Sequence, residues 1–180
     1  IELSNVSASM KFFQTKTRNK LIDELVSPII STGTNDELYL KFSYSYATRL
    51  AHLYKDSLKV YLSTDQGVTF PNLLFAKGGQ DLATHTGDIS YDDYFPEIAG
   101  DWKDETIDIS EFAGSENIVV KFVGVNDNGN NVFIDNVKVY STTEPNSIAE
   151  KETFDIIVYP NPANDYITVS NLNLNQSLGE

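Results

Sequence analysis

Apolar and polar residues alternate along several short stretches of the chain, with the period of two that predicts β-strands buried on one side. The clearest stretch is 38–46, in which every second side chain is apolar. Its apolar positions are Leu38, Leu40, Phe42, Tyr44 and Tyr46. The same pattern recurs in 57–63 and, more briefly, in 7–15. We therefore expect strands here, each with its apolar side facing a core.

No stretch shows the apolar period of a long helix, and turns rich in Gly, Asp and Asn separate the strand-like segments. This arrangement predicts an all-β fold, a jelly-roll β-sandwich over residues 1–142 with a short C-terminal extension. Residues 77–100 lose the periodicity. A loop of that length in a compact domain is usually functional or held down by its own side chains.

Residues 118–140 predict two long strands joined as a hairpin by the polar loop 126–131. Counting by twos along the second strand places Asp135 on the same side as three apolar residues. A carboxylate that faces a core must be paired, hydrogen-bonded, metal-bound or protonated, because an unpaired buried charge is too costly. Asp135 is therefore the main candidate for a site.

Two interpretations of Asp135 stay open. In the first, it binds a structural Ca²⁺ together with Asp127 and Asn126, because calcium prefers several oxygen ligands and this loop is rich in them. In the second, Asp135 accepts backbone N–H bonds from a neighbouring loop and holds that loop in place. Asn and Gly in such a loop are also expected for turn geometry alone.

Composition narrows the classes of function. The net charge of −13 argues against nucleic-acid binding, which concentrates Lys and Arg. Cysteine is absent, which excludes disulfides and Cys-type zinc sites. The two histidines, His52 and His85, are too far apart for a zinc-binding helix, so no zinc is expected. No run of about 18 apolar residues predicts a membrane span.

Aromatic residues in the long loop and beside it offer a second kind of site. Tyr91, Tyr94 and Trp102 are candidates for a surface that stacks on a glycan, although aromatics in a sandwich more often fill its core or rim. Neighbouring acids such as Asp92 and Asp93 are expected to be solvated rather than catalytic. No catalytic set can be assembled from these residues, so the fragment is not expected to be an enzyme.

Three stretches, 56–64, 102–114 and 129–139, resemble the MAM-like, cleaved-adhesin or choice-of-anchor jelly-roll modules of secreted bacterial proteins. The string DSLKVYLSTDQGVTF and the segments after it resemble the module that follows the catalytic domain of secreted cytophagalysin-like (pappalysin-family) zinc metallopeptidases. The His-Glu-x-x-His motif of those peptidases is absent. The resemblance therefore implies a non-catalytic accessory domain beside an upstream domain, with a calcium ion at Asp135.

Residues 143–153 have the polar composition of a linker, and 154–180 predict two strands around a Pro-Asn-Pro turn. The string YPNPANDYITV, with Tyr159, Pro160, Asn161 and Pro162 at its start, is similar to the opening of a type A sorting domain of the type IX secretion system. This resemblance implies a truncated sorting domain, the type IX machinery as a partner, and a location outside the bacterial outer membrane, secreted or on the cell surface.

These expectations combine into one functional hypothesis and one alternative. The hypothesis is a calcium-stabilised accessory module that holds or targets an adjacent domain of the same polypeptide. The candidate parent protein is a secreted zinc metallopeptidase. The alternative is a stand-alone adhesin or carbohydrate-binding domain, with a glycan or a host surface protein as its ligand.

Overall fold

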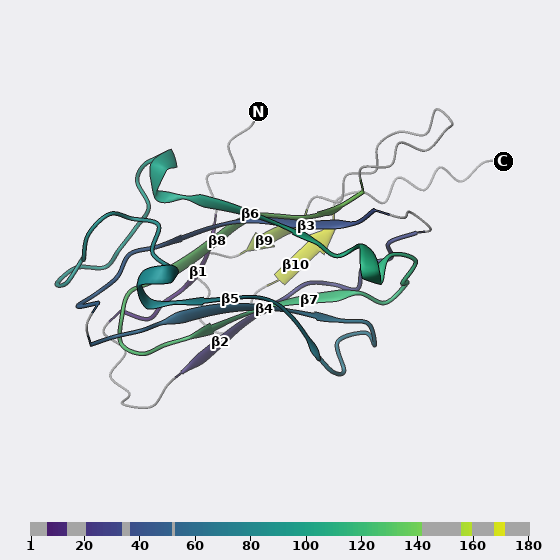
Figure 1. Cartoon of the computed structure of the whole chain (residues 1–180), viewed down its shortest axis with the longest axis horizontal. Coiled ribbons are helices and arrows are strands. Elements are labelled where there is room, and N and C mark those ends of the chain that lie inside the picture. The colour runs from purple at the N-terminus through teal and green to yellow at the C-terminus, as the bar shows by residue number, and fades with distance from the viewer. Residues whose placement is uncertain are drawn as a thin grey trace.

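The computed structural model describes residues 7–13, 21–33, 37–51 and 53–141, together with the backbone of 156–159 and 168–171. Two four-stranded antiparallel sheets pack face to face (Figure 1). The first sheet has the order β1 (Ala8–Met10), β8 (Val132–Tyr140), β3 (Tyr39–Tyr46) and β6 (Lys103–Asp108). The second has the order β2 (Ile22–Val26), β7 (Val119–Val125), β4 (Ser57–Ser63) and β5 (Asn72–Gly78).

The strand pairing confirms the jelly roll. The first strand pairs with the eighth, the second with the seventh, the third with the sixth and the fourth with the fifth. Such nested pairs arise when one long antiparallel ribbon winds over itself into two sheets. The described helical residues lie only in three-residue turns: η1 (Gly79–Asp81), η2 (Ala99–Asp101) and η3 (Ser110–Phe112). None of the described segments is a helix long and apolar enough to cross a bilayer.

The core lies between the sheets and follows the alternation in the sequence. All five apolar residues predicted to face inward from 38–46 are buried. The inward residues of β4 are buried as well: Leu58, Val60 and Leu62. Met10 and Phe12 also enter the core, although β1 itself covers only three residues. β2 lies at the edge of its sheet, where it pairs with β7.

The hairpin predicted for 118–140 is wrong. β7 and β8 are both strands, but β7 lies in the second sheet and β8 in the first. The loop 126–131 therefore carries the chain across the sandwich from one sheet to the other instead of turning it back beside itself. Periodicity cannot distinguish these cases, since both require two apolar strands joined by a polar loop.

Four connections gather at one end of the sandwich, on the left of Figure 1. They follow β1, β3, β5 and β7, and each passes from one sheet to the other. We call the described residues of these connections the loop end: 11–13, 47–51, 53–56, 79–102 and 126–131. The strand register places the ends of β1 and β3 beside the starts of β6 and β8, which brings these loops together.

The opposite end is closed by shorter turns. In the β4–β5 connection, Asp65 accepts hydrogen bonds from the backbone N–H of Thr69 at 2.9 Å and its hydroxyl at 2.7 Å. The hydroxyl of Ser63 donates to Asp65 at 2.6 Å, and this bond is the main cause that lowers the pKa of Asp65 to about 2. Gln66 and Gly67 take positive φ angles of 64° and 84°, as a tight hairpin turn requires.

The C-terminal extension contains the two strands that its sequence predicts. β9 (Ile156–Tyr159) and β10 (Thr168–Asn171) pair antiparallel as a separate two-stranded sheet. Tyr159 is the last residue of β9, whereas Pro160, Asn161 and Pro162 lie outside the described residues. The linker and sorting-domain boundaries at 143–153 and 154–180 stay predictions.

Candidate functional site

A buried carboxylate, Asp56, is the centre of the loop end. Asp56 directly precedes β4 and is fully buried. Its Oδ1 accepts the backbone N–H of Asp127 at 2.6 Å and that of Gly129 at 3.0 Å. Its Oδ2 accepts the N–H of Asn130 at 2.7 Å and the hydroxyl of Tyr46 at 3.1 Å. One side chain thus fixes three residues of the loop between β7 and β8.

These contacts and the burial of both side chains shift the pKa values of Asp56 and Tyr46. Burial raises the pKa of Asp56, and the N–H of Asp127 is the strongest of the donors that counter this effect. Burial, followed by the charge of Asp56, raises the pKa of Tyr46. Hydrogen bonds from four donors stabilise a carboxylate that would otherwise be costly to bury.

Gly129 lets the loop approach this carboxylate closely. A Cβ atom at position 129 would lie 2.6 Å from Cγ of Asp56 and closer still to Oδ2. It would also lie 2.9 Å from the hydroxyl of Tyr46. The loop can therefore accept this geometry only with glycine at that position.

Arg49 connects all four loops of this end. Its guanidinium donates to the carbonyl of Asn128 at 2.8 Å and to the carbonyl of Ser90 at 3.1 Å. It also lies over the rings of Phe13, 4.9 Å from the centroid, and Tyr54, at 5.4 Å. These contacts combine hydrogen bonds with cation–π attraction, which a guanidinium is suited to make together.

Asn130 joins the β7–β8 loop to the long loop 79–102. Its Oδ1 accepts the backbone N–H of Tyr94 at 2.9 Å. Its Nδ2 donates to the carbonyls of Ile89 and Asp92, each at 3.2 Å. The amide, which is fully buried, thereby replaces three backbone hydrogen bonds that an irregular loop cannot make for itself.

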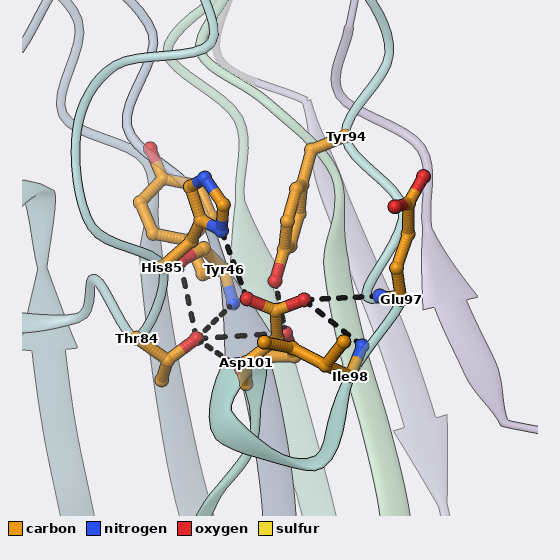
Figure 2. A network of polar contacts seen from close by, with 8 residues as sticks. Tyr46, Thr84, His85, Tyr94, Glu97, Ile98 and Asp101 are labelled. Atoms are coloured by element: carbon orange, nitrogen blue, oxygen red, sulfur yellow. Dashed lines mark hydrogen bonds and ion pairs between the residues drawn. The ribbon is translucent and has the colours of Figure 1, made fainter.

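A second buried acid, Asp101, holds the far part of the long loop, as Figure 2 shows. Its Oδ2 accepts the backbone N–H groups of Glu97 at 3.0 Å and Ile98 at 3.3 Å. Its Oδ1 lies 2.9 Å from Nδ1 of His85. The hydrogen bond from His85 is the main cause that lowers the pKa of Asp101.

The main chain of Asp101 is bonded to two hydroxyl groups, one on β3 and one in the long loop. Its carbonyl accepts a hydrogen bond from Ser45 at 2.6 Å. It accepts another from Thr84, also at 2.6 Å (Figure 2). The hydroxyl of Tyr94 shares a 2.6 Å hydrogen bond with Ser45. Ser45 is fully buried although it lies on the outer side of its sheet, because the long loop covers it.

The lowered pKa of Asp101 gives a pH prediction. Its contribution to stability is present above the pKa of about 4 for an unfolded Asp, and it is lost as the pH falls through the lower folded-state pKa. We expect Asp101→Asn to cost roughly 1–2 kcal/mol at pH 7, because charge-assisted bonds to two N–H groups are weakened. Urea unfolding at pH 7 and pH 3 should show a smaller cost at pH 3. An equal cost at both pH values would contradict this role.

The predicted facing of Asp135 is wrong, because a β-bulge interrupts β8. Lys138 pairs with Lys41 and Asp135 with Ser43, so two residues of β8 oppose the single residue between them on β3. Asn136 takes the positive φ of 53° at this bulge. Val137 and Val139 therefore face the core together with Ile134, while Phe133 belongs to the outer cluster. Asp135 is half-buried on that outer side.

The three residues predicted to bind calcium each accept a separate backbone hydrogen bond. Oδ1 of Asp135 accepts the N–H of Asn136 at 2.7 Å. Asp127 accepts the N–H of Lys55 at 3.1 Å, and Asn126 accepts that of Asn128 at 2.6 Å. Within the described ranges, no group of three or more His, Cys, Asp or Glu residues could hold a metal ion. The calcium ion stays a prediction.

The three aromatic candidates have different surroundings. Tyr91 is 87% exposed and its ring is open to a ligand. Tyr94 is buried against Ala47 and Phe133, so its ring offers no face to a glycan in this structure. Trp102 is partly buried against the same cluster. His85 is bound to Asp101, and His52 lies outside the described residues.

Sequence reasoning missed Asp56 and Asp101, which organise this end. The interpretation given to Asp135, a carboxylate that accepts loop N–H bonds, applies instead to Asp56. A weak signal was present, since each acid stands next to a strand or at the end of an irregular loop. Alternation carries no information about side chains that lie outside strands.

The fold and this end define a jelly-roll sandwich domain whose long loops are held together at one end by hydrogen bonds. Among solved structures it is similar to the K3 cleaved adhesin domain of Lys-gingipain from Porphyromonas gingivalis W83, with a TM-score of 0.50 and 19% identity. The match covers 77% of this chain and 75% of that one. At this identity the likeness establishes a shared fold. No family model and no curated protein matches the sequence.

Proposed function

We propose that this chain is a non-catalytic, adhesin-like accessory module of a secreted or cell-surface bacterial protein. The observation that supports it most is the loop end, in which buried side chains fix long loops on a sandwich like that of an adhesin domain. Rigid scaffolds that display fixed loops are suited to binding, because the entropy cost of ordering the loop is met before the ligand arrives.

Three acids of this end already accept hydrogen bonds from the protein, which argues against their acting as catalytic acids or bases. Asp56 and Asp101 accept hydrogen bonds from backbone N–H groups, and the acid Asp88 accepts one from the hydroxyl of Thr48. The test is to assay the purified chain against glycan arrays and surface proteins, and against peptide and polysaccharide substrates. Binding without turnover supports the proposal, and turnover of any substrate overturns it.

The stand-alone adhesin or carbohydrate-binding domain remains the second candidate. It is favoured by the exposure of Tyr91 on the long loop. The two candidates differ in whether the module acts alone. Binding by the isolated chain equal to that of its parent polypeptide would favour the second candidate.

Calcium forms part of the proposal, with Asp135 as its first ligand. Oδ2 of Asp135 accepts no hydrogen bond within the described part of the chain, and burial raises the pKa of this carboxyl. A cation at Oδ2 would stabilise the charged form. The remaining ligands would be the loop oxygens of Asp127 and Asn126, provided that they exchange their present N–H donors for the ion.

This gives a direct prediction for thermal unfolding. We expect that adding 1 mM Ca²⁺ to protein first freed of metal by a chelator raises Tm, by roughly 2–4 °C for each kcal/mol of stabilisation from binding. Asp135→Ala should abolish this rise. Asp108→Asn at the opposite end is the control and should keep it. A Tm that is independent of calcium in the unaltered chain would remove the ion from the account.

The location and the parent protein are proposed on sequence similarity. The string that begins at Tyr159 supports export by the type IX system, and the sandwich segments support a metallopeptidase or an adhesin as the parent. Fractionation of the source bacterium tests the location. Antibodies to the sandwich should detect it on the cell surface or in the medium, and detection in the cytoplasm alone would contradict export.

A further inference from the structure

The long loop exposes apolar side chains within one short stretch, residues 91–98. Tyr91 is 87% exposed, Phe95 57% and Ile98 66%. Large apolar side chains gathered on an exposed loop are a feature of interaction sites. We call this stretch the loop tip.

The loop tip is held in place from both sides. The backbone of Asp92 and Tyr94 is bonded to Asn130, and the backbone of Glu97 and Ile98 is bonded to Asp101. Tyr94, in the middle of the stretch, is buried and acts as its anchor. The exposed side chains are therefore displayed by fixed backbone, so a partner would not have to order the loop.

The charged residues within the loop tip are all acidic. Asp92, Asp93 and Glu97 are exposed, and in the part of the chain that the structure describes none of the three forms an ion pair. The sequence contains no Lys or Arg between Lys77 and Lys103. An aromatic ring beside carboxylates attracts a guanidinium or ammonium group by cation–π and Coulomb forces together.

We propose that the loop tip binds a cationic protein segment, with Lys or Arg side chains placed against Tyr91 and the acids around it. This inference rests on the proposed adhesin-like function and names the chemistry of its partner. A neutral glycan is the less favoured occupant, because Phe95 and Ile98 offer it no hydrogen bond. Anionic glycans would be repelled by the same carboxylates.

The test uses cytochrome c, a basic folded protein, as the probe and biolayer interferometry on the whole chain. We expect binding that weakens by roughly tenfold or more between 50 and 300 mM salt. Tyr91→Ala, and the double change Asp92→Asn with Asp93→Asn, should each weaken it by about fivefold. Because these side chains are exposed, the variants should keep the Tm of the unaltered chain.

Matched controls lie at the opposite end of the sandwich. Val68→Ala removes an 80% exposed side chain there, and Glu111→Gln with Glu116→Gln changes the net charge by the same amount as the aspartate pair. Both should leave the affinity unchanged. Equal weakening by the two double changes would show attraction to net charge alone and would overturn the inference.

Two further outcomes separate the inference from the proposed function. Binding of a neutral glycan without binding of cytochrome c would overturn the cationic partner and leave the adhesin-like function standing. The absence of binding to cytochrome c, glycans and surface proteins alike would overturn both.

Discussion

Replacement of Gly129 by alanine is expected to destabilise the domain by about 3 kcal/mol, near the upper end of the usual cost of overpacking. The added Cβ would lie 2.6 Å from Cγ of Asp56 and 2.9 Å from the hydroxyl of Tyr46. Neither neighbour can retreat, because both are buried and bonded to each other. For a chain of this size the loss corresponds to a fall in Tm of roughly 6–12 °C.

Gly100→Ala is the matched control for this change. Position 100 also lies in the loop end, but a Cβ there would meet only Cδ1 of Ile98, at an ordinary 3.6 Å. Its Tm should stay within about 2 °C of the unaltered chain. Similar Tm values for Gly129→Ala and Gly100→Ala would show that the loop does not approach Asp56 as described.

Asp56→Asn is expected to cost a similar amount, about 3 kcal/mol. The amide keeps one oxygen but places an NH₂ group where the carboxylate accepted a third N–H and a hydroxyl. Buried donors that lose their acceptor carry the full cost of desolvation. Chemical denaturation at pH 7, with linear extrapolation to water, measures the loss.

Asp127→Asn is the control for the change at Asp56. Asp127 accepts one backbone N–H, from Lys55, near the surface. Its substitution should therefore cost less than about 1 kcal/mol. An Asp56→Asn variant as stable as Asp127→Asn would mean that the buried carboxylate does not organise this end.

The alternation of side chains predicted most of the fold. It located β1, β3, β4, β7 and β8, and it identified the inward residues of β3 and β4, because a strand buried on one side imposes a period of two on its own sequence. It failed where the structure breaks that period. The bulge at Asn136 shifts the phase of β8, and counting through it turned Asp135 to the wrong side.

The candidate site was harder to predict from the sequence, because it consists of contacts between loops that are far apart in the chain. Asp56 meets residues 127–130, and Asp101 meets His85 and Ser45. No local pattern encodes such a pairing, because it depends on four loops meeting at one end of the jelly roll. The acid pairs noted in the sequence proved less informative than two isolated acids.

The central claim is that buried carboxylates hold the loop end rigid. Hydrogen exchange of single amides tests it most directly, at Asp127, Gly129 and Asn130 beside Asp56 and at Glu97 and Ile98 beside Asp101. We predict that these five loop amides exchange as slowly as amides of the core strands, and that Asp56→Asn accelerates the first three selectively. Exchange of these amides at the rate of an open surface loop would contradict the account.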